Sequence, residues 1–459
     1  MEETAQAGTL QTTEHPNKIH AWYVVSVLVL AYTVSFIDRT ILTLLIEPVR
    51  AALDITDTEI SLLYGIAFAI FYTVLGIPIA WFADRKNRTV IISIGIFIWS
   101  LMTALCGLAQ SFWQMFLARV GVGIGQAALS PAAYSMIADY FEPEKLSRAL
   151  SVYTTGLFIG SGLALMLGGV IISVTPAMTL PVIGPMEPWQ MVFIIVGLPG
   201  LLVVALMVTV REPARRGLAA KVARPASDGD AQPGLGRELG ETVCFIWSQR
   251  RTYFYHFFGF SAFAFIWMGT SSWIPTYFIR THGWSVGEVG FNYGLVVLVL
   301  GSAGIISGGY VASWMKQKGY QDADMRTGII AAVCVLPFGV IAPLMANDWA
   351  ALVLFAGLTF FTSFPWGAAA AALQVITPNR MRAMVSALYL FVLNLAAIGC
   401  GPTVVALITD QVFEDIYALK YSLSISVAVA APITALILWK SLASYRESVA
   451  KAETYQLAQ

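Results

Sequence analysis

Apolar stretches long enough to cross a lipid bilayer occupy most of this 459-residue chain. A membrane-spanning helix needs about 20 consecutive, mainly apolar residues. Twelve such stretches lie at residues 20–47, 58–83, 89–109, 112–139, 147–175, 189–211, 252–280, 286–314, 326–346, 349–377, 382–410 and 418–442. Because only 12% of the residues are charged and 58% are hydrophobic, the chain has too little polar surface for a soluble globule. We therefore predict an all-α integral membrane protein of twelve transmembrane helices.

Two segments of the chain repeat one another. Glu59 begins the run EISLLYG and Glu288 begins EVGFNYG, and the register continues into AWFADRKNR in the first copy and GYVASWMKQK in the second. The repeat predicts two pseudo-symmetric bundles of six helices, at residues 20–211 and 252–445. Two similar bundles can rock about a site held between them, so this organisation favours a transporter that works by alternating access.

A long polar interruption separates the two halves. Residues 212–251 are rich in Pro, Gly and cations, which is typical of a flexible linker, although a short amphipathic helix near residues 238–247 is compatible with the sequence. Residues 1–19 and 446–459 are expected to form N-terminal and C-terminal tails. Lys and Arg concentrate in the tails, the linker and alternate connections, which predicts that both termini and the linker are cytoplasmic. The membrane would be the inner (plasma) membrane if the source is bacterial.

Several classes of function fit this chain poorly. A net charge of zero gives no reason to expect a nucleic-acid partner. The four histidines and four cysteines show no metal-ligand spacing, and no nucleophile–base motif is present, so we expect no metal, no cofactor and no enzyme activity. A channel would need a continuous polar pore, and the spans contain no ring of charged positions. A receptor that binds without transporting stays open as an alternative. We expect a monomer.

The charged turn at residues 80–88, AWFADRKNR, resembles a loop signature of the major facilitator superfamily, and the resemblance extends over the entire chain. Other runs are similar to the Spinster-like branch: FIDR at 36–39, GVGIGQAALSPAA at 121–133, WIPTYFIRTHG at 273–283, LQVITPNRMR at 373–382 and GPTVVALITDQVF at 401–413. The resemblance implies the two-bundle fold and an amphiphilic sphingolipid or lysolipid substrate. The sequence departs from the pattern twice, with Ala80 at a usual Gly and Gln126 at a usual Glu.

Asp38 and Arg39 are charged residues well inside the first predicted span. Such residues are costly in a membrane and usually face each other or an aqueous cavity. Burial and a neighbouring cation act in opposite directions on the protonation of a carboxylate, so movement of Arg39 or of a substrate could make Asp38 bind and release a proton. This is a hypothesis for proton coupling, driven by a proton gradient. The alternative is a static Asp38–Arg39 pair that only fixes the helix.

Gln126 and Arg119 lie in the fourth predicted span. Gln126 is expected to face inward, where it can form hydrogen bonds but cannot carry a proton. Either Asp38 alone handles the proton, or the protein is a uniporter, or Gln126 is an engineered change that holds one conformation; a simple hydrogen bond across helices is also possible. The resemblance implies that Arg119 meets the substrate or the coupling acid. The alternative is an arginine that snorkels to the membrane surface.

Aromatic side chains are expected to line the central cavity, together with Asp38, Arg39, Arg119 and Gln126. The aromatic candidates are Tyr32, Phe68, Tyr153 and Trp267. An aromatic cavity with a small charged spot suits an amphiphile with one polar head and an apolar tail. Organic anions, sugars and drugs are the alternative substrates, and some of these rings could instead face lipid.

The charged turn and its neighbours are expected to form a cytoplasmic gate. Its residues are Asp84, Arg85, Arg88, Asp139 and Arg148. The resemblance implies that Asp84 meets the start of the eleventh span and that Asp139 and Arg148 complete the gate. The alternative is a cationic anchor at the membrane surface.

Overall fold

The computed structural model describes residues 18–83, 85–141, 149–150, 152–180, 184–213, 235–378 and 381–457. Residues 1–17 of the predicted N-terminal tail and residues 214–234 of the predicted linker therefore lie outside the described residues. Asp84 and Arg148 of the predicted gate also lie outside them.

The first half of the chain forms a bundle of helices. Its elements are α1 (Lys18–Leu44), α2 (Ile46–Leu53), α3 (Asp57–Tyr64), α4 (Ile66–Ala83), α5 (Arg88–Cys106), α6 (Phe112–Gln126), α7 (Leu129–Tyr140), α9 (Gly156–Val174) and α10 (Pro188–Val208). A short antiparallel hairpin of β1 (Met178–Leu180) and β2 (Gly184–Met186) joins α9 to α10, and the sequence analysis did not foresee it.

The second half forms a matching bundle. Its elements are α13 (Arg250–His282), α14 (Val286–Val296), η1 (Val297–Gly301), α15 (Ser302–Gln317), α16 (Ala323–Ile341), η2 (Ala342–Leu344), α17 (Asp348–Ser363), α18 (Trp366–Ile376), α19 (Arg382–Asn394), η4 (Leu395–Cys400), α20 (Gly401–Leu407), η5 (Ile408–Phe413), η6 (Ile416–Ala418) and α21 (Leu419–Leu457). Helix α21 continues through most of the segment expected as a C-terminal tail. Helix α12 (Leu235–Ser248) precedes this bundle and confirms the short helix that the linker sequence allowed.

Eleven helical segments of the described chain are long and apolar enough to cross a membrane. The fourth predicted span, 112–139, is the one absent from this set; it carries the polar residues Gln114, Arg119 and Gln126, and it consists of α6 and α7 with a turn at Ala127 and Ala128 between them. Together these two helices cover the predicted stretch. The protein is an all-α, multi-pass membrane protein whose twelve spans form two pseudo-symmetric bundles.

The repeated sequence starts a helix in the same way in each half. Thr56 and Ser285 each accept a hydrogen bond from the backbone of the residue three positions later, and Glu59 and Glu288 reach back to them, so both copies form a capping box. This reciprocal arrangement satisfies backbone N–H groups that a helix start would otherwise leave without a partner.

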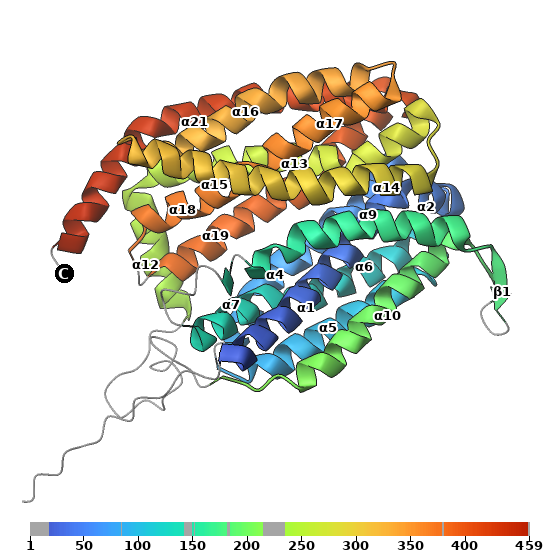
Figure 1. Ribbon diagram of the computed structural model, residues 1–459, viewed down its shortest axis with the longest axis horizontal. Coiled ribbons are helices and arrows are strands. Elements are labelled where there is room, and N and C mark those ends of the chain that lie inside the picture. Colours follow the sequence, from blue (N-terminus) through green and yellow to red (C-terminus); the bar gives the residue numbers. More distant parts are fainter. Residues whose placement is uncertain are drawn as a thin grey trace, which may run out of the picture.

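Figure 1 shows the two bundles packed along their lengths, with the helices from α1 to α10 in one and those from α13 to α21 in the other. Helix α9 packs on α14, α3 on α20, and α4 on η4. We call the end with α12 the linker face and the end with α2 and the β hairpin the opposite face (Figure 1). The surfaces that meet between the bundles enclose the site described next.

Candidate translocation cavity

A cavity of about 460 Å³ lies between the two bundles. Helices α1, α3, α4, α7 and α9 contribute side chains from one half, and α13, α14, α17, α18 and α19 are among those that contribute from the other. Most of the lining is aromatic or aliphatic, with hydroxyl groups of Ser, Thr and Tyr interspersed. The polar and aromatic side chains include Tyr32, Phe36, Arg39, Thr40, Thr43, Tyr64, Tyr72, Ser161, Trp267, Tyr293, Thr359, Trp366, Tyr389 and Asn394.

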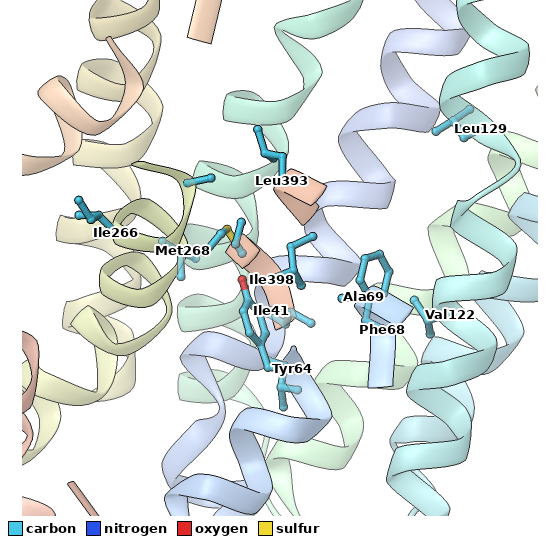
Figure 2. Packing of buried hydrophobic residues seen from close by; sticks show 14 of the residues in the cluster. Ile41, Tyr64, Phe68, Ala69, Val122, Leu129, Ile266, Met268, Leu393 and Ile398 are labelled. Carbon is cyan, nitrogen blue, oxygen red and sulfur yellow. The ribbon is translucent and has the colours of Figure 1, made fainter. Parts of the chain in front are cut away.

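The repeat supplies one tyrosine to the cavity from each bundle. Tyr64 and Tyr293 occupy the same position in the two copies, and both line the cavity. Figure 2 shows Tyr64 beside Ile41, with its ring extending toward the region of Met268 and Ile398 of the other bundle. Neither tyrosine was predicted from the sequence as a site residue, although their shared position in the repeat was a usable signal.

A glycine follows each of these tyrosines where the bundles cross. A Cβ at Gly65 would clash with the carbonyl oxygen of Ile398, and a Cβ at Gly294 would lie 3.0 Å from the carbonyl oxygen of Gly162. The first crossing joins α3 and α4 to η4, and the second joins α14 to α9. Glycine is needed at both positions because the backbones of the two bundles approach closely there.

Among the described residues that line the cavity, Arg39 is the charged one. Its Nε and Nη2 atoms donate hydrogen bonds of 3.1 and 2.9 Å to the side-chain oxygen of Gln126. Its guanidinium carbon lies 4.7, 4.5 and 4.9 Å from the ring centres of Phe36, Phe68 and Tyr72. Hydrogen bonds and cation–π contacts therefore hold the guanidinium in one place at the cavity wall.

Gln126 supports Arg39 without neutralising its charge. The amide nitrogen of Gln126 donates to the carbonyl oxygen of Ser35 at 3.1 Å, so the amide oxygen faces the guanidinium. The amide is a neutral acceptor, whereas a glutamate here would place a negative charge against Arg39. Gln126 is buried behind Arg39 and does not line the cavity.

Asp38 lies beside Arg119 in the interior of the first bundle. Both residues are fully buried, and the Nη1 atom of Arg119 donates to the backbone carbonyl of Asp38 at 3.1 Å. The carboxylate of Asp38 interacts with the guanidinium of Arg119 and with the side-chain donors of Thr103 and Trp99. Successive helix residues are about 100° apart, so Arg39 faces the cavity while Asp38 faces inward.

The four predicted aromatic residues divide into two pairs. Tyr32 and Trp267 line the cavity, whereas Phe68 and Tyr153 lie behind its wall. Tyr153 stacks on Tyr32 with ring centres 4.5 Å apart, and Phe68 stacks on Tyr72 at 5.1 Å. The buried rings therefore fix the orientation of those that face the cavity.

At the linker face, Arg88 is the centre of an ion cluster within the first bundle. It is fully buried, and it contacts Asp139 at 2.5 Å and Glu212 at 2.7 Å. Arg88 also donates to the hydroxyl of Ser135 at 2.8 Å. These contacts join the start of α5 to the end of α7 and to the chain that follows α10. Arg85 lies on the surface just before them.

At the opposite face, Arg280 of α13 joins the two bundles. Its side chain is 3% exposed and contacts Asp57 at 2.5 Å and Glu47 at 2.6 Å. Asp410 accepts two further hydrogen bonds, each 2.7 Å, from the backbone and hydroxyl of Thr58. Sequence reasoning missed this cluster, because the partners lie more than 220 positions apart and share no motif.

Residues 28–402 match the sequence model of a protein family described as the Major Facilitator Superfamily. The chain belongs to this superfamily. Its members are transporters rather than enzymes, so this superfamily member is a transporter that carries a small-molecule substrate.

Individual relatives are similar over nearly their full length. An MFS-type efflux pump of Mycolicibacterium smegmatis is 30% identical, with 94% of each chain covered. A probable L-galactonate transporter of Escherichia coli is 24% identical, over 87% of this chain and 85% of its own. The crystal structure of a bacterial homologue of the human lysosomal transporter Spinster, in an inward-facing and unoccupied conformation, superposes with a TM-score of 0.74 at 26% identity, covering 96% of this chain and 99% of its own. This superfamily transporter is therefore Spinster-like.

Proposed function

We propose that this transporter is a proton-coupled carrier of an amphiphilic anion, of the lysophospholipid or sphingoid phosphate type. The observation that carries the proposal is the position of Arg39: among the described residues that line the cavity, it is the one charged side chain. Its hydrogen-bond acceptor, Gln126, is neutral, so its positive charge is available to a substrate.

The rest of the cavity supports an apolar tail. Its surface is mainly aromatic and aliphatic, and its volume of about 460 Å³ is in the range of small-molecule sites. An anionic head group at Arg39 could accept hydrogen bonds from nearby hydroxyls, such as those of Thr40 and Thr43, while a single acyl chain extends along Trp267 and Trp366.

Asp38 is the proposed proton carrier. It is a fully buried carboxylate beside Arg119, and it shares a helix with Arg39. A proton bound at Asp38 would neutralise the carboxylate beside Arg119. Asp38 immediately precedes Arg39, the proposed contact of the substrate. In this proposal, protonation and substrate binding are coupled through α1.

Alternating access would proceed by rocking the two bundles about the cavity. The contacts of Arg280 and Asp410 close the opposite face, and we propose that this face is extracellular, with the linker face and both termini cytoplasmic. The closed opposite face is consistent with a conformation that opens toward the cytoplasm. We further propose that the carrier resides in a cell's inner membrane as a monomer.

A sugar acid is the second candidate substrate. It is favoured by the similarity to a protein named for L-galactonate, which is a carboxylate, because Arg39 would serve either anion. The aromatic character of the cavity favours the amphiphile.

Uptake by proteoliposomes tests both candidates. The purified chain would be reconstituted and given a labelled lysophospholipid, a sphingoid phosphate or galactonate, with and without a pH gradient. We expect saturable, gradient-driven flux of an amphiphile, and Asp38→Asn should abolish its dependence on the gradient. Glu447→Gln, the same chemical change on an exposed part of α21, is the matched control. Flux of galactonate without flux of either lipid would show that the substrate is a sugar acid and not an amphiphile. Flux by the unchanged chain that does not depend on the pH gradient would contradict proton coupling.

A further inference from the structure

A second concave site lies on the outer surface of the C-terminal bundle, at its linker face. This groove of about 480 Å³ runs between the end of α15, the start of α16 and the middle of α21. Its apolar lining includes Met315, Ile329, Ile330 and Leu442. The groove is separate from the central cavity, since the two share no lining residue.

Two exposed tryptophans border the groove. The side chains of Trp314 and Trp439 are 53% and 62% exposed, although both are large and apolar. Exposed tryptophans of this kind are enriched where lipid head groups meet the acyl chains. This enrichment favours a position of the groove at the membrane interface.

Two of the residues that line the groove are cations, and each lies over an aromatic ring. The ammonium of Lys318 lies 4.1 Å from the ring centre of Trp314, and the guanidinium of Arg326 lies 4.7 Å from that of Tyr320. All four residues line the groove. The cation–π contacts hold both positive charges at the wall of the groove.

The charge at this wall is not balanced by nearby acids. Asp322 is shared by Arg326, at 2.6 Å, and Arg446, at 3.8 Å. Lys318 has no carboxylate within 4.0 Å in the described part of the chain. Two cations thus share one carboxylate, and a third has none, which leaves a net positive charge for an anion.

We propose that this groove binds an anionic phospholipid of the surrounding membrane, with its phosphate between Lys318 and Arg326 and one acyl chain over Ile329 and Ile330. A basic pocket between transmembrane helices is a known form of site for anionic head groups. The aliphatic lining, the aromatic border and the unbalanced charge each match one part of such a lipid. The bound lipid would hold the α15–α16 turn against α21.

Native mass spectrometry of the full chain tests this site. The protein, purified in detergent, would be titrated with phosphatidylglycerol or with phosphatidylcholine of the same acyl chains, and bound lipids counted. We expect preferential retention of phosphatidylglycerol and about fivefold weaker retention in Lys318→Gln, the change expected from about 1 kcal/mol per lysine near a membrane surface. Lys318→Arg should retain the preference.

Lys420 provides the matched control, because it also lies over a tyrosine ring, Tyr421 at 5.1 Å, but near the opposite face of the molecule. Lys420→Gln should leave the retention of phosphatidylglycerol unchanged. Equal losses in the two lysine variants, or equal retention of the two lipids by the unchanged chain, would overturn the proposal. Neither result depends on the transported substrate, so the site stands or fails independently of the proposed function.

Discussion

The guanidinium of Arg280 in α13 meets the carboxylate of Asp57 in α3 through two parallel hydrogen bonds of 2.5 and 2.6 Å. This fork-to-fork pair, which Glu47 extends, crosses from one bundle to the other at the opposite face. A paired geometry of this kind is strong and directional. In the proposed alternating-access cycle, this pair would have to break when the opposite face opens.

Arg280→Gln should therefore shift the protein toward states that are open at the opposite face. Loss of one partner of a buried charge pair costs about 2–5 kcal/mol, enough to shift a two-state equilibrium by tenfold or more. Distances between spin labels at positions 51 and 417 would report the opening. Arg50→Gln is the control, since Arg50 also approaches Asp57, at 3.7 Å, but belongs to the same bundle. Unchanged distances in Arg280→Gln would show that the pair does not hold the gate.

Gln126→Glu should weaken the binding of an anionic substrate by about tenfold at neutral pH, because the introduced carboxylate would neutralise Arg39. Affinity should recover as the pH falls, since protonation restores a neutral acceptor. The ratio of flux with a pH gradient to flux without one should rise. Binding isotherms and uptake over a pH series would check both effects. An affinity for the anion that is independent of this substitution would place the substrate away from Arg39.

Arg39→Lys should raise the half-saturation concentration of the anion by about tenfold, although the charge is kept. Lysine lacks the planar fork that donates twice to Gln126 and stacks among the rings of Phe68 and Tyr72. Uptake of the anion over a concentration series measures the effect. An uncharged analogue of the same substrate should be unaffected, and equal losses for both compounds would indicate a general defect.

Gly65→Ala should impair the packing of the bundles, because its Cβ would clash with the backbone carbonyl of Ile398. Overpacking of this kind costs about 1–3 kcal/mol. We expect a lower midpoint of thermal unfolding and slower transport. Gly76→Ala is the control on α4, since a Cβ there meets nothing within 4 Å. If both variants behaved like the unchanged chain, the close crossing would be dispensable.

Arg88→Gln should lower the free energy of unfolding by about 3–5 kcal/mol, because Asp139 and Glu212 would lose their shared buried cation. Thermal unfolding followed by tryptophan fluorescence would measure the loss. Arg237→Gln, which removes an exposed pair with Glu241, should cost less than about 1 kcal/mol. Similar midpoints for the two variants would show that the buried cluster contributes little.

Much of the fold follows from the sequence because the membrane restricts what a backbone can do. An apolar stretch such as 349–377 has to become a helix when no water can satisfy its N–H and C=O groups. The helices α17 and α18 occupy this stretch with a turn at Phe364 and Pro365. The hairpin of β1 and β2 was not foreseen because it lies between spans, where this restriction no longer applies.

The site was harder to predict than the fold. A charge inside a span singles out Asp38 and Arg39, but only the structure shows that one faces the inside of the bundle and the other the cavity. One interpretation of the sequence paired Asp38 with Arg39 in a static ion pair. In the structure, Arg39 instead donates hydrogen bonds to Gln126. The partners of Arg280 come from distant parts of the chain, and a single sequence gives no information on such contacts.

The consecutive residues Tyr64 and Gly65, and their counterparts Tyr293 and Gly294, have a mechanical consequence. In each bundle, a tyrosine that lines the cavity immediately precedes a glycine at which the backbone of the other bundle approaches closely. In the proposed cycle, a substrate that displaces either tyrosine would therefore act directly on the glycine where the two bundles cross. The rocking of the bundles would then respond to the substrate at two equivalent points of the repeat.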